Sequence, residues 1–137
     1  MGYILLSSFR IDNPHLIVGL FTQYSNTQIS LNSKKPIELK DIFFNSDEFT
    51  SHFIFWNPSK NLNFAYKIHE KYEGFSKPVI IFKNYCDEKT YISFTIEKLT
   101  KKELELKLIK EYSSKNIKIN TEIIKLNRTA GPPENMD

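Results

Sequence analysis

Hydrophobic and polar residues alternate most clearly in the segment 90–110, on both sides of a short polar break at 99–102. The hydrophobic residues that share one face of this segment are Ile92, Phe94, Ile96, Leu104, Leu106 and Leu108. A period of two is typical of a half-buried strand, whereas a helix would need apolar spacings of three and four residues. The segment is therefore predicted to form a β-hairpin with one buried face.

Comparable patterns occur along most of the chain, separated by turn residues such as those at 32–36, 57–61 and 87–89. The other extended segments that the pattern predicts are 16–31, 38–44, 49–56, 62–72, 78–86 and 117–128. In the last of them the alternation changes phase between Ile119 and Ile124, which predicts a bulge near Asn120 or Thr121.

Short connections and the lack of a crossover helix predict an all-β fold, an up-and-down antiparallel meander of about eight strands. Such a meander hides its edges best by closing into a barrel. An open sandwich with Greek-key connections is the structural alternative. We expect one domain over residues 1–128, with residues 1–14 closing one end of the barrel, and a C-terminal tail at 129–137.

Composition supports strands and limits the partners. The 137 residues are 40% hydrophobic and 14% aromatic, and aromatic side chains suit a pleated, half-buried surface. The net charge is +3, and lysine carries nearly all of the positive charge, since Arg10 and Arg128 are the only arginines. A specific nucleic-acid binder would more often use arginine forks, so no nucleic-acid partner is expected.

Targeting signals give no compartment. No apolar run reaches the roughly 18 residues of a membrane span, so no transmembrane segment is expected. The apolar start at 1–6 is too short for a signal peptide, and it has no basic flank and no cleavage site. Localisation stays unknown, with the cell envelope an option if a leader was removed.

Residues that could carry catalysis are sparse. The spacing of His15, His52 and His69 matches no metal motif, and no sequence pattern of a nucleophile or phosphate loop is present. Cys86 is the only cysteine, which excludes an internal disulfide, and we expect it to be a small buried side chain. We therefore expect no cofactor, no metal and no enzyme, although a barrel-mouth enzyme that uses His52 or His69 is a third hypothesis.

Aromatic faces of several strands are the strongest candidates for binding. In the segment 49–56, His52 alternates with Ile54 and Trp56, so we place it toward the barrel interior. The residues expected to line a pocket are Phe43, His52, Ile54, Trp56, Phe64, Tyr66 and Phe94. The alternative is that these aromatic faces simply fill a packed core. A barrel of about eight strands can do either.

Short motifs along the chain resemble small bacterial lipocalin-like (calycin) domains. The run 16–21 resembles the Gly-x-Trp strand of that family, with Gly19 in place and Phe21 where the family has tryptophan. Segments 42–49 and 96–106 resemble two of the family's hairpins. Arg128 stands where the family has an arginine packed over the first-strand aromatic ring. The resemblance implies that Gly19, Phe21 and Arg128 close one end of a barrel.

Two main hypotheses for function follow. In the first, the protein is a non-enzymatic lipocalin-like barrel that binds and transports a small hydrophobic molecule. In the second, a barrel with a filled core acts through its outer surface, as a structural module or with a protein partner. The interior volume is the feature that separates these hypotheses: a cavity of several hundred Å³, or none.

Overall fold

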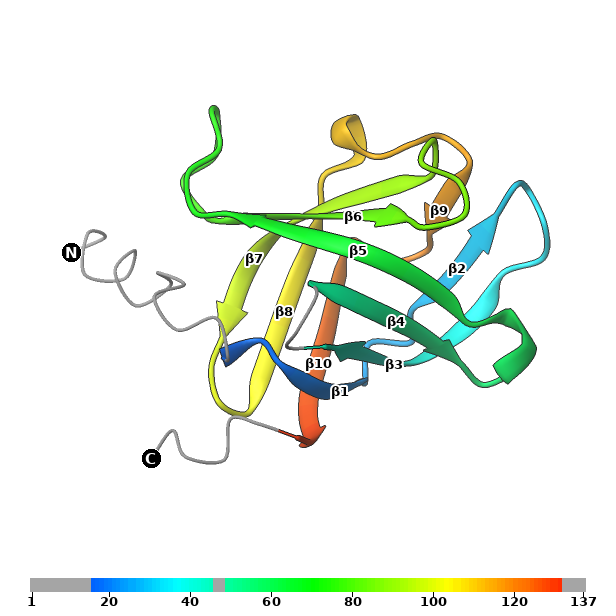
Figure 1. Ribbon diagram of the computed structural model, residues 1–137, viewed down its shortest axis with the longest axis horizontal. Helices are drawn as coiled ribbons and strands as arrows, with labels where there is room; N and C mark the ends of the chain where they lie inside the picture. The colour runs from blue at the N-terminus through cyan, green and yellow to red at the C-terminus, as the bar shows by residue number, and fades with distance from the viewer. Residues whose placement is uncertain (1–15, 46–48, 132–137) are drawn as a thin grey trace.

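The computed structural model describes residues 16–45 and 49–131, and in this part of the chain the fold is an antiparallel β-barrel (Figure 1). The barrel strands are β1 (Gly19–Gln23), β3 (Ile37–Phe44), β4 (Thr50–Phe55), β5 (Leu62–His69), β6 (Val79–Asn84), β7 (Tyr91–Leu99), β8 (Glu103–Leu108) and β10 (Ile123–Ala130). Two short strands extend its wall, β2 (Gln28–Leu31) and β9 (Ile117–Ile119). Single 3₁₀ turns lie at η2 (Pro58–Lys60) and η3 (Lys110–Tyr112).

Strand order closes the barrel. From β3 to β8 each strand pairs with the next one along the chain, and β8 pairs with β10. The first strand, β1, pairs with β10 on one side and with β3 on the other. The meander of eight strands closed into a barrel is thus confirmed, and the fold is not an open sandwich.

The first strand is interrupted where the sequence predicts one continuous run over 16–31. The Gln23 side chain binds the backbone there: its Oε1 accepts hydrogen bonds from the amides of Ser25 (2.8 Å) and Thr27 (3.2 Å). Asn26 has a left-handed φ of 59°. These local hydrogen bonds replace the hydrogen bonds to neighbouring strands and so separate β1 from β2.

A matching break interrupts the last strand between β9 and β10, at the position predicted from the phase change. The two breaks lie side by side, since the hydroxyls of Thr27 and Thr121 are 2.9 Å apart. The amide of Gln28 donates to Asn120 Oδ1 at 2.6 Å. Beyond these breaks β2 pairs with β3 and β9, so the first and last strands continue together as an extension of the wall.

Aromatic rings fill the barrel interior. The fully buried phenylalanines, from six different strands, are Phe21, Phe44, Phe53, Phe64, Phe82 and Phe94. Phe82 is central among them, with its ring centroid 5.1 Å from that of Phe53 and 5.8 Å from that of Phe94. Tilted and edge-to-face contacts of this kind are favourable for aromatic pairs. The middle of the barrel is therefore a packed core.

Arg128 ties the start of the described chain to the end of the barrel. Its guanidinium lies over the Phe21 ring, 4.5 Å from the centroid. It donates hydrogen bonds to the backbone carbonyls of Leu16, Val18 and Lys101. Burial lowers the pKa of Arg128 to about 10, which is still far above neutral pH. A cation held by three carbonyls and a ring is the main contact that caps this end.

Gly19 begins β1 at the same end, with a φ of 131° that residues bearing a Cβ rarely adopt. A Cβ added to Gly131 would lie only 3.1 Å from the Gly19 Cα. The two glycines therefore let the first and last strands approach closely just beside Arg128.

The predictions for the two chain ends and for Cys86 have different outcomes in the structure. The predicted N-terminal closing segment, 1–14, lies outside the described residues. Strand β10 continues to Ala130, so the pairing extends past the predicted boundary at Arg128, because Ala130 pairs with Leu20. The prediction that Cys86 is buried is wrong: it is exposed in the β6–β7 turn, where its amide donates to Asn84 Oδ1.

Replacing Phe21 tests the core beside the closed end. Phe21→Ala leaves a cavity under the Arg128 guanidinium and should reduce the free energy of unfolding by about 3–5 kcal/mol. Urea denaturation measures the change, and Tyr24→Ala, at a side chain that is 50% exposed, is the control, with an expected change within about 0.5 kcal/mol. A loss below about 1 kcal/mol for Phe21→Ala would contradict this packing.

Replacing Arg128 tests the cap itself. Arg128→Lys keeps the positive charge, but a single ammonium group cannot reach the carbonyls of Leu16, Val18 and Lys101 together. We expect a loss of about 1–3 kcal/mol in unfolding free energy, since partly buried carbonyls lose their donors. Equal stability of the variant and the parent protein would show that these hydrogen bonds do not contribute.

Candidate functional site

Three of the seven residues predicted to bind a ligand belong to the packed core. Phe64 and Phe94 are fully buried, and Tyr66 is 6% exposed. Burial raises the pKa of the Tyr66 hydroxyl to about 12. Their rings contact other rings, with the Phe64 and Phe53 centroids 4.7 Å apart and those of Tyr66 and Phe44 5.2 Å apart. These three residues therefore fill the interior instead of lining a hollow.

The other four, Phe43, His52, Ile54 and Trp56, are only partly buried or exposed, whereas Ser51, Phe53 and Phe55 of β4 face the interior. The inward orientation expected for His52 is thus reversed. The run 53–56 is apolar on both faces, so alternation alone does not determine which side is inside. Cross-strand pairing decides it, because Phe53 pairs with the buried Ile42.

His52 lies on the outer surface, and one of its two ring nitrogens is already engaged. Its ring stacks on Phe43 at 5.9 Å between centroids, and Nδ1 lies 2.5 Å from Asn63 Oδ1. His69 packs against Tyr72 at 5.1 Å. Both of these histidines contact an aromatic ring, and His52 is hydrogen-bonded to an amide instead of a carboxylate. His15 lies outside the described residues. Within the described ranges, no three His, Cys, Asp or Glu side chains are grouped so that they could hold a metal ion.

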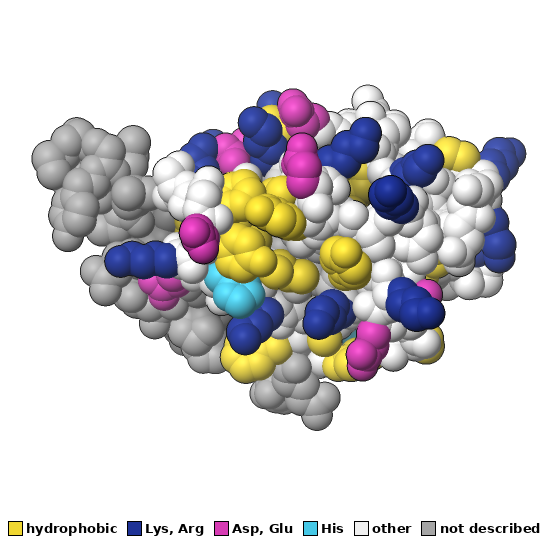
Figure 2. Space-filling view, turned by 90° about the horizontal axis from the view of Figure 1, so that it is seen from above, with side chains coloured by type: hydrophobic (Ala, Val, Ile, Leu, Met, Phe, Trp, Pro, Cys, Tyr) yellow, Lys and Arg dark blue, Asp and Glu magenta, His cyan; other side chains and the backbone are white. Residues whose placement is uncertain are grey.

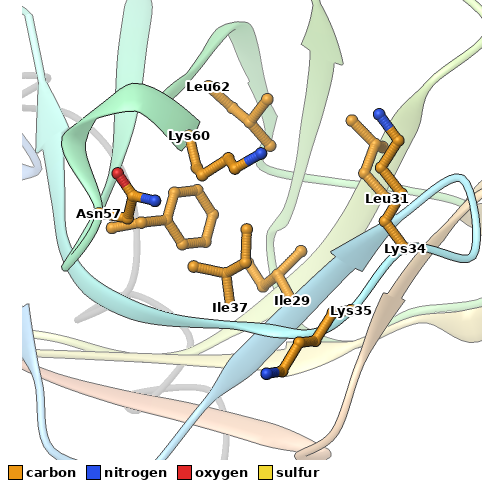
Figure 3. Close-up of a pocket in the computed structure, with 9 residues that line it drawn as sticks. Ile29, Leu31, Lys34, Lys35, Ile37, Asn57, Lys60 and Leu62 are labelled. Carbon is orange, nitrogen blue, oxygen red and sulfur yellow. The ribbon is translucent and has the colours of Figure 1, made fainter.

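A cavity of about 440 Å³ lies at the end of the barrel opposite Arg128 (Figure 3). Its apolar wall is formed by Ile29, Leu31, Ile37, Phe55 and Leu62. Its polar rim is formed by Lys34, Lys35, Asn57 and Lys60. In Figure 3 the Lys60 amine points across the mouth toward the space above Ile37 and Ile29. The Lys35 amine points away from the apolar wall in the same view. The site therefore combines an aliphatic and aromatic pocket with the Lys60 amine at its opening and two further lysines on its rim.

Two connections of the barrel place this rim. In the β2–β3 turn, Asn32 and Ser33 adopt left-handed φ values of 56° and 60°, and the Lys34 amide donates to Leu31 O at 3.1 Å. This tight turn projects Lys34 and Lys35 beside the mouth. In the β4–β5 connection, Asn57 caps η2 by accepting a hydrogen bond from the Ser59 amide at 3.2 Å.

Charge at the rim is uncompensated within the described residues. Lys34, Lys35 and Lys60 are exposed, and none of them has a carboxylate from residues 16–45 or 49–131 within 4.0 Å. The ion pairs of the described part of the chain are made instead by Lys77 and Lys98, on other strands and loops. An anionic group at the mouth would therefore meet amines that have no competing internal partner.

A second hollow, of about 310 Å³, lies between the β5–β6 connection and β7–β8, and its Glu97 carboxylate is already paired. Glu97 accepts hydrogen bonds from Lys77 Nζ and from the Thr95 hydroxyl, each at 2.5 Å. Burial opposes ionisation of Glu97, but these bonds outweigh it and hold its pKa below the ordinary value. The open-end cavity is the better candidate because it is larger and its wall is mainly apolar.

The residues of the open-end cavity were missed at the sequence level, apart from the turns that carry them. The sequence identifies turns at 32–36 and 57–61, and in an up-and-down barrel every second connection lies at the same end. That rule could have placed Lys34, Lys35 and Lys60 together. Nothing in the alternation indicates that a cavity opens between them.

Comparison with known protein families gives no matching model, and comparisons with curated proteins and with solved structures give no match either. In the described part of the chain, no helix has the length and apolar character needed to cross a membrane. The architecture and the open-end cavity therefore carry the functional argument.

Two tryptophan substitutions distinguish the filled interior from the open end. Phe64→Trp enlarges a fully buried side chain and should cost about 1–3 kcal/mol of unfolding free energy through overpacking. Leu62→Trp extends into the cavity, where space exists, and should change stability by less than about 1 kcal/mol. Urea denaturation of both variants measures the difference, and a well-tolerated Phe64→Trp would indicate an interior hollow.

Proposed function

We propose that the protein is a non-enzymatic, lipocalin-like binding module whose open-end cavity holds a small amphipathic anion. The apolar part of the ligand lies against Ile29, Ile37, Phe55 and Leu62, and its acidic group lies at the lysine rim. The observation that carries the proposal is the 440 Å³ cavity, which has an apolar wall and uncompensated amines at its mouth. Its volume is within the range of roughly 300–1,000 Å³ usual for small-molecule sites.

Physical chemistry supports this ligand class. Each Å² of apolar ligand surface removed from water contributes about 25 cal/mol. The immobilised ligand loses translational and rotational freedom, which offsets part of that gain. A carboxylate or similar group adds charge-assisted hydrogen bonds with lysine, which are stronger than neutral ones. A fatty-acid-like molecule satisfies both halves of the site.

A second candidate function is an interaction module that acts through the outside of the filled barrel. An external aromatic cluster favours it: the rings of Tyr72 and Tyr112 are 6.0 Å apart, and those of Phe75 and Tyr112 are 5.8 Å apart. Tyr112 is 46% exposed. Figure 2, which looks onto the side of the barrel where the β5–β6 connection and η3 lie, shows a hydrophobic patch bordered by charged side chains. A partner protein could cover such a patch.

Titration with a fluorescent fatty-acid analogue tests the first function. We expect saturable binding in the micromolar range, lost in Leu62→Trp, which fills the cavity, and weakened about tenfold or more by Lys60→Glu, which opposes the anionic group. Lys67→Ala, on the exposed face of β5, should leave the affinity unchanged.

Circular dichroism and urea denaturation of each variant confirm that the fold is retained. Absence of binding to the native protein, or equal binding by Leu62→Trp and Lys67→Ala, would contradict the cavity proposal. The interaction module would then be the function that the structure supports.

A further inference from the structure

Four connections surround the open end of the barrel, and two of them present large aromatic side chains to solvent. Trp56, at the start of the β4–β5 connection, is 61% exposed, and Tyr85, at the start of the β6–β7 turn, is 54% exposed. Both lie near the cavity, since Trp56 precedes the rim residue Asn57 and the Tyr85 amide donates to Asn63 O, next to Leu62. Lys40 Nζ, on β3, lies 4.9 Å from the centroid of the Trp56 ring. Two exposed aromatic residues therefore lie on connections around one mouth.

Lysine dominates the charge of these connections. The charged residues of segments 32–36, 56–61, 85–90 and 113–116 are Lys34, Lys35, Lys60, Lys89 and Lys115 against Asp87 and Glu88. The Asp87 carboxylate is turned back into its own turn, where it accepts from the Lys89 amide at 3.1 Å and from the Thr90 hydroxyl at 3.0 Å. Figure 2 shows lysines standing out at the right-hand end, which is the open end in Figure 1.

From this combination we infer that the open end of the barrel docks on the surface of an anionic lipid bilayer. Tryptophan and tyrosine are the residues that settle at the membrane–water interface, where the ring meets apolar surface and its polar edge stays hydrated. Lysines near an anionic leaflet each contribute about 1 kcal/mol of attraction. Binding to a membrane surface strengthens with the apolar area buried and with electrostatic attraction to anionic lipids, and this end of the barrel supplies both contributions.

The inference rests on the proposed function and adds the source of its ligand. With Trp56 and Tyr85 in the headgroup layer, the cavity mouth faces the membrane. An amphipathic anion can then move between the bilayer and the cavity without exposing its apolar part to water, a transfer that would cost about 25 cal/mol for each Å² exposed. The rim lysines attract anionic lipid headgroups first and the acidic group of the ligand afterwards.

The use of lysine instead of arginine at the rim is consistent with a partner whose charged groups are mobile. The rim has no arginine, so it lacks the rigid forks that read fixed phosphate positions on a nucleic acid. Mobile lysine side chains are compact point charges that adapt to headgroups in a fluid layer. The bilayer is therefore the partner that the aromatic rings and lysines fit together.

The chain contains a single tryptophan, which makes Trp56 an internal reporter of docking. Flotation with vesicles of phosphatidylcholine mixed with phosphatidylglycerol should recover the protein, whereas vesicles of phosphatidylcholine alone should recover much less. In the mixed vesicles the emission of Trp56 should shift to the blue and be quenched by bromine atoms placed high on the acyl chains. Added salt should reverse the binding, since it screens the lysines.

Matched variants locate the contact. Lys34→Gln with Lys35→Gln should weaken vesicle binding about fivefold for each lysine removed. The control pair, Lys71→Gln with Lys102→Gln, removes the same charge from exposed positions at the opposite end of the barrel and should have little effect. Trp56→Ala should also weaken vesicle binding, whereas Tyr24→Ala should leave it unchanged.

The two proposals fail separately. Leu62→Trp should lose the fatty-acid analogue in solution yet still float with mixed vesicles, which would support docking by the rim alone. Failure of the native protein to float, equal recovery on both vesicle types, or equal loss in the two lysine pairs would overturn the docking inference. Binding of the soluble analogue would still stand in each of those cases.

Discussion

Insertion of β1 between β3 and β10 is the constraint on which the other features depend. A sheet of this length would otherwise expose two edges of unpaired backbone groups. Pairing on both sides of β1 removes them and encloses the phenylalanine core. Because Phe21 and Arg128 are opposite each other in the β1–β10 register, the same pairing brings the guanidinium over the ring.

The two ends of the barrel differ in how their cations are used. At the closed end, Arg128 is held by backbone carbonyls and a ring. At the open end, Lys34, Lys35 and Lys60 lie beside an apolar cavity and have no carboxylate partner among the described residues. The proposed function is therefore placed at the open end.

Alternation predicted the barrel well, because most strands bury one face, and a one-residue shift would expose their large apolar side chains. The same rule could not orient β4, where Phe53, Ile54 and Phe55 are consecutive and both phases look hydrophobic. It also could not show the break after Gln23, since that break depends on one side chain accepting several backbone and hydroxyl hydrogen bonds. Hydrogen bonds between one side chain and the nearby backbone cannot be inferred from the alternation of hydrophobic and polar residues.

The cavity escaped prediction for a related reason. Its wall residues, such as Ile29 and Leu62, look like ordinary core positions, and only the paths of two connections leave space between them. By contrast, the contact of Phe21 with Arg128 was expected from the family resemblance, because it involves residues within paired strands. Features set by strand register can be inferred from sequence more readily than those set by loops.

The hydrogen bond from Arg128 to Val18 joins residues 110 positions apart. Contacts of such long sequence separation carry a large loop-closure entropy, which must be met before their energy is gained. Hairpins such as β7–β8 involve short loops and can form early, while the seam between β1 and β10 forms only after nearly the whole chain is ordered. Until that seam closes, the edges of β1 and β10 stay unpaired, and such edges are sites where one chain can pair with another.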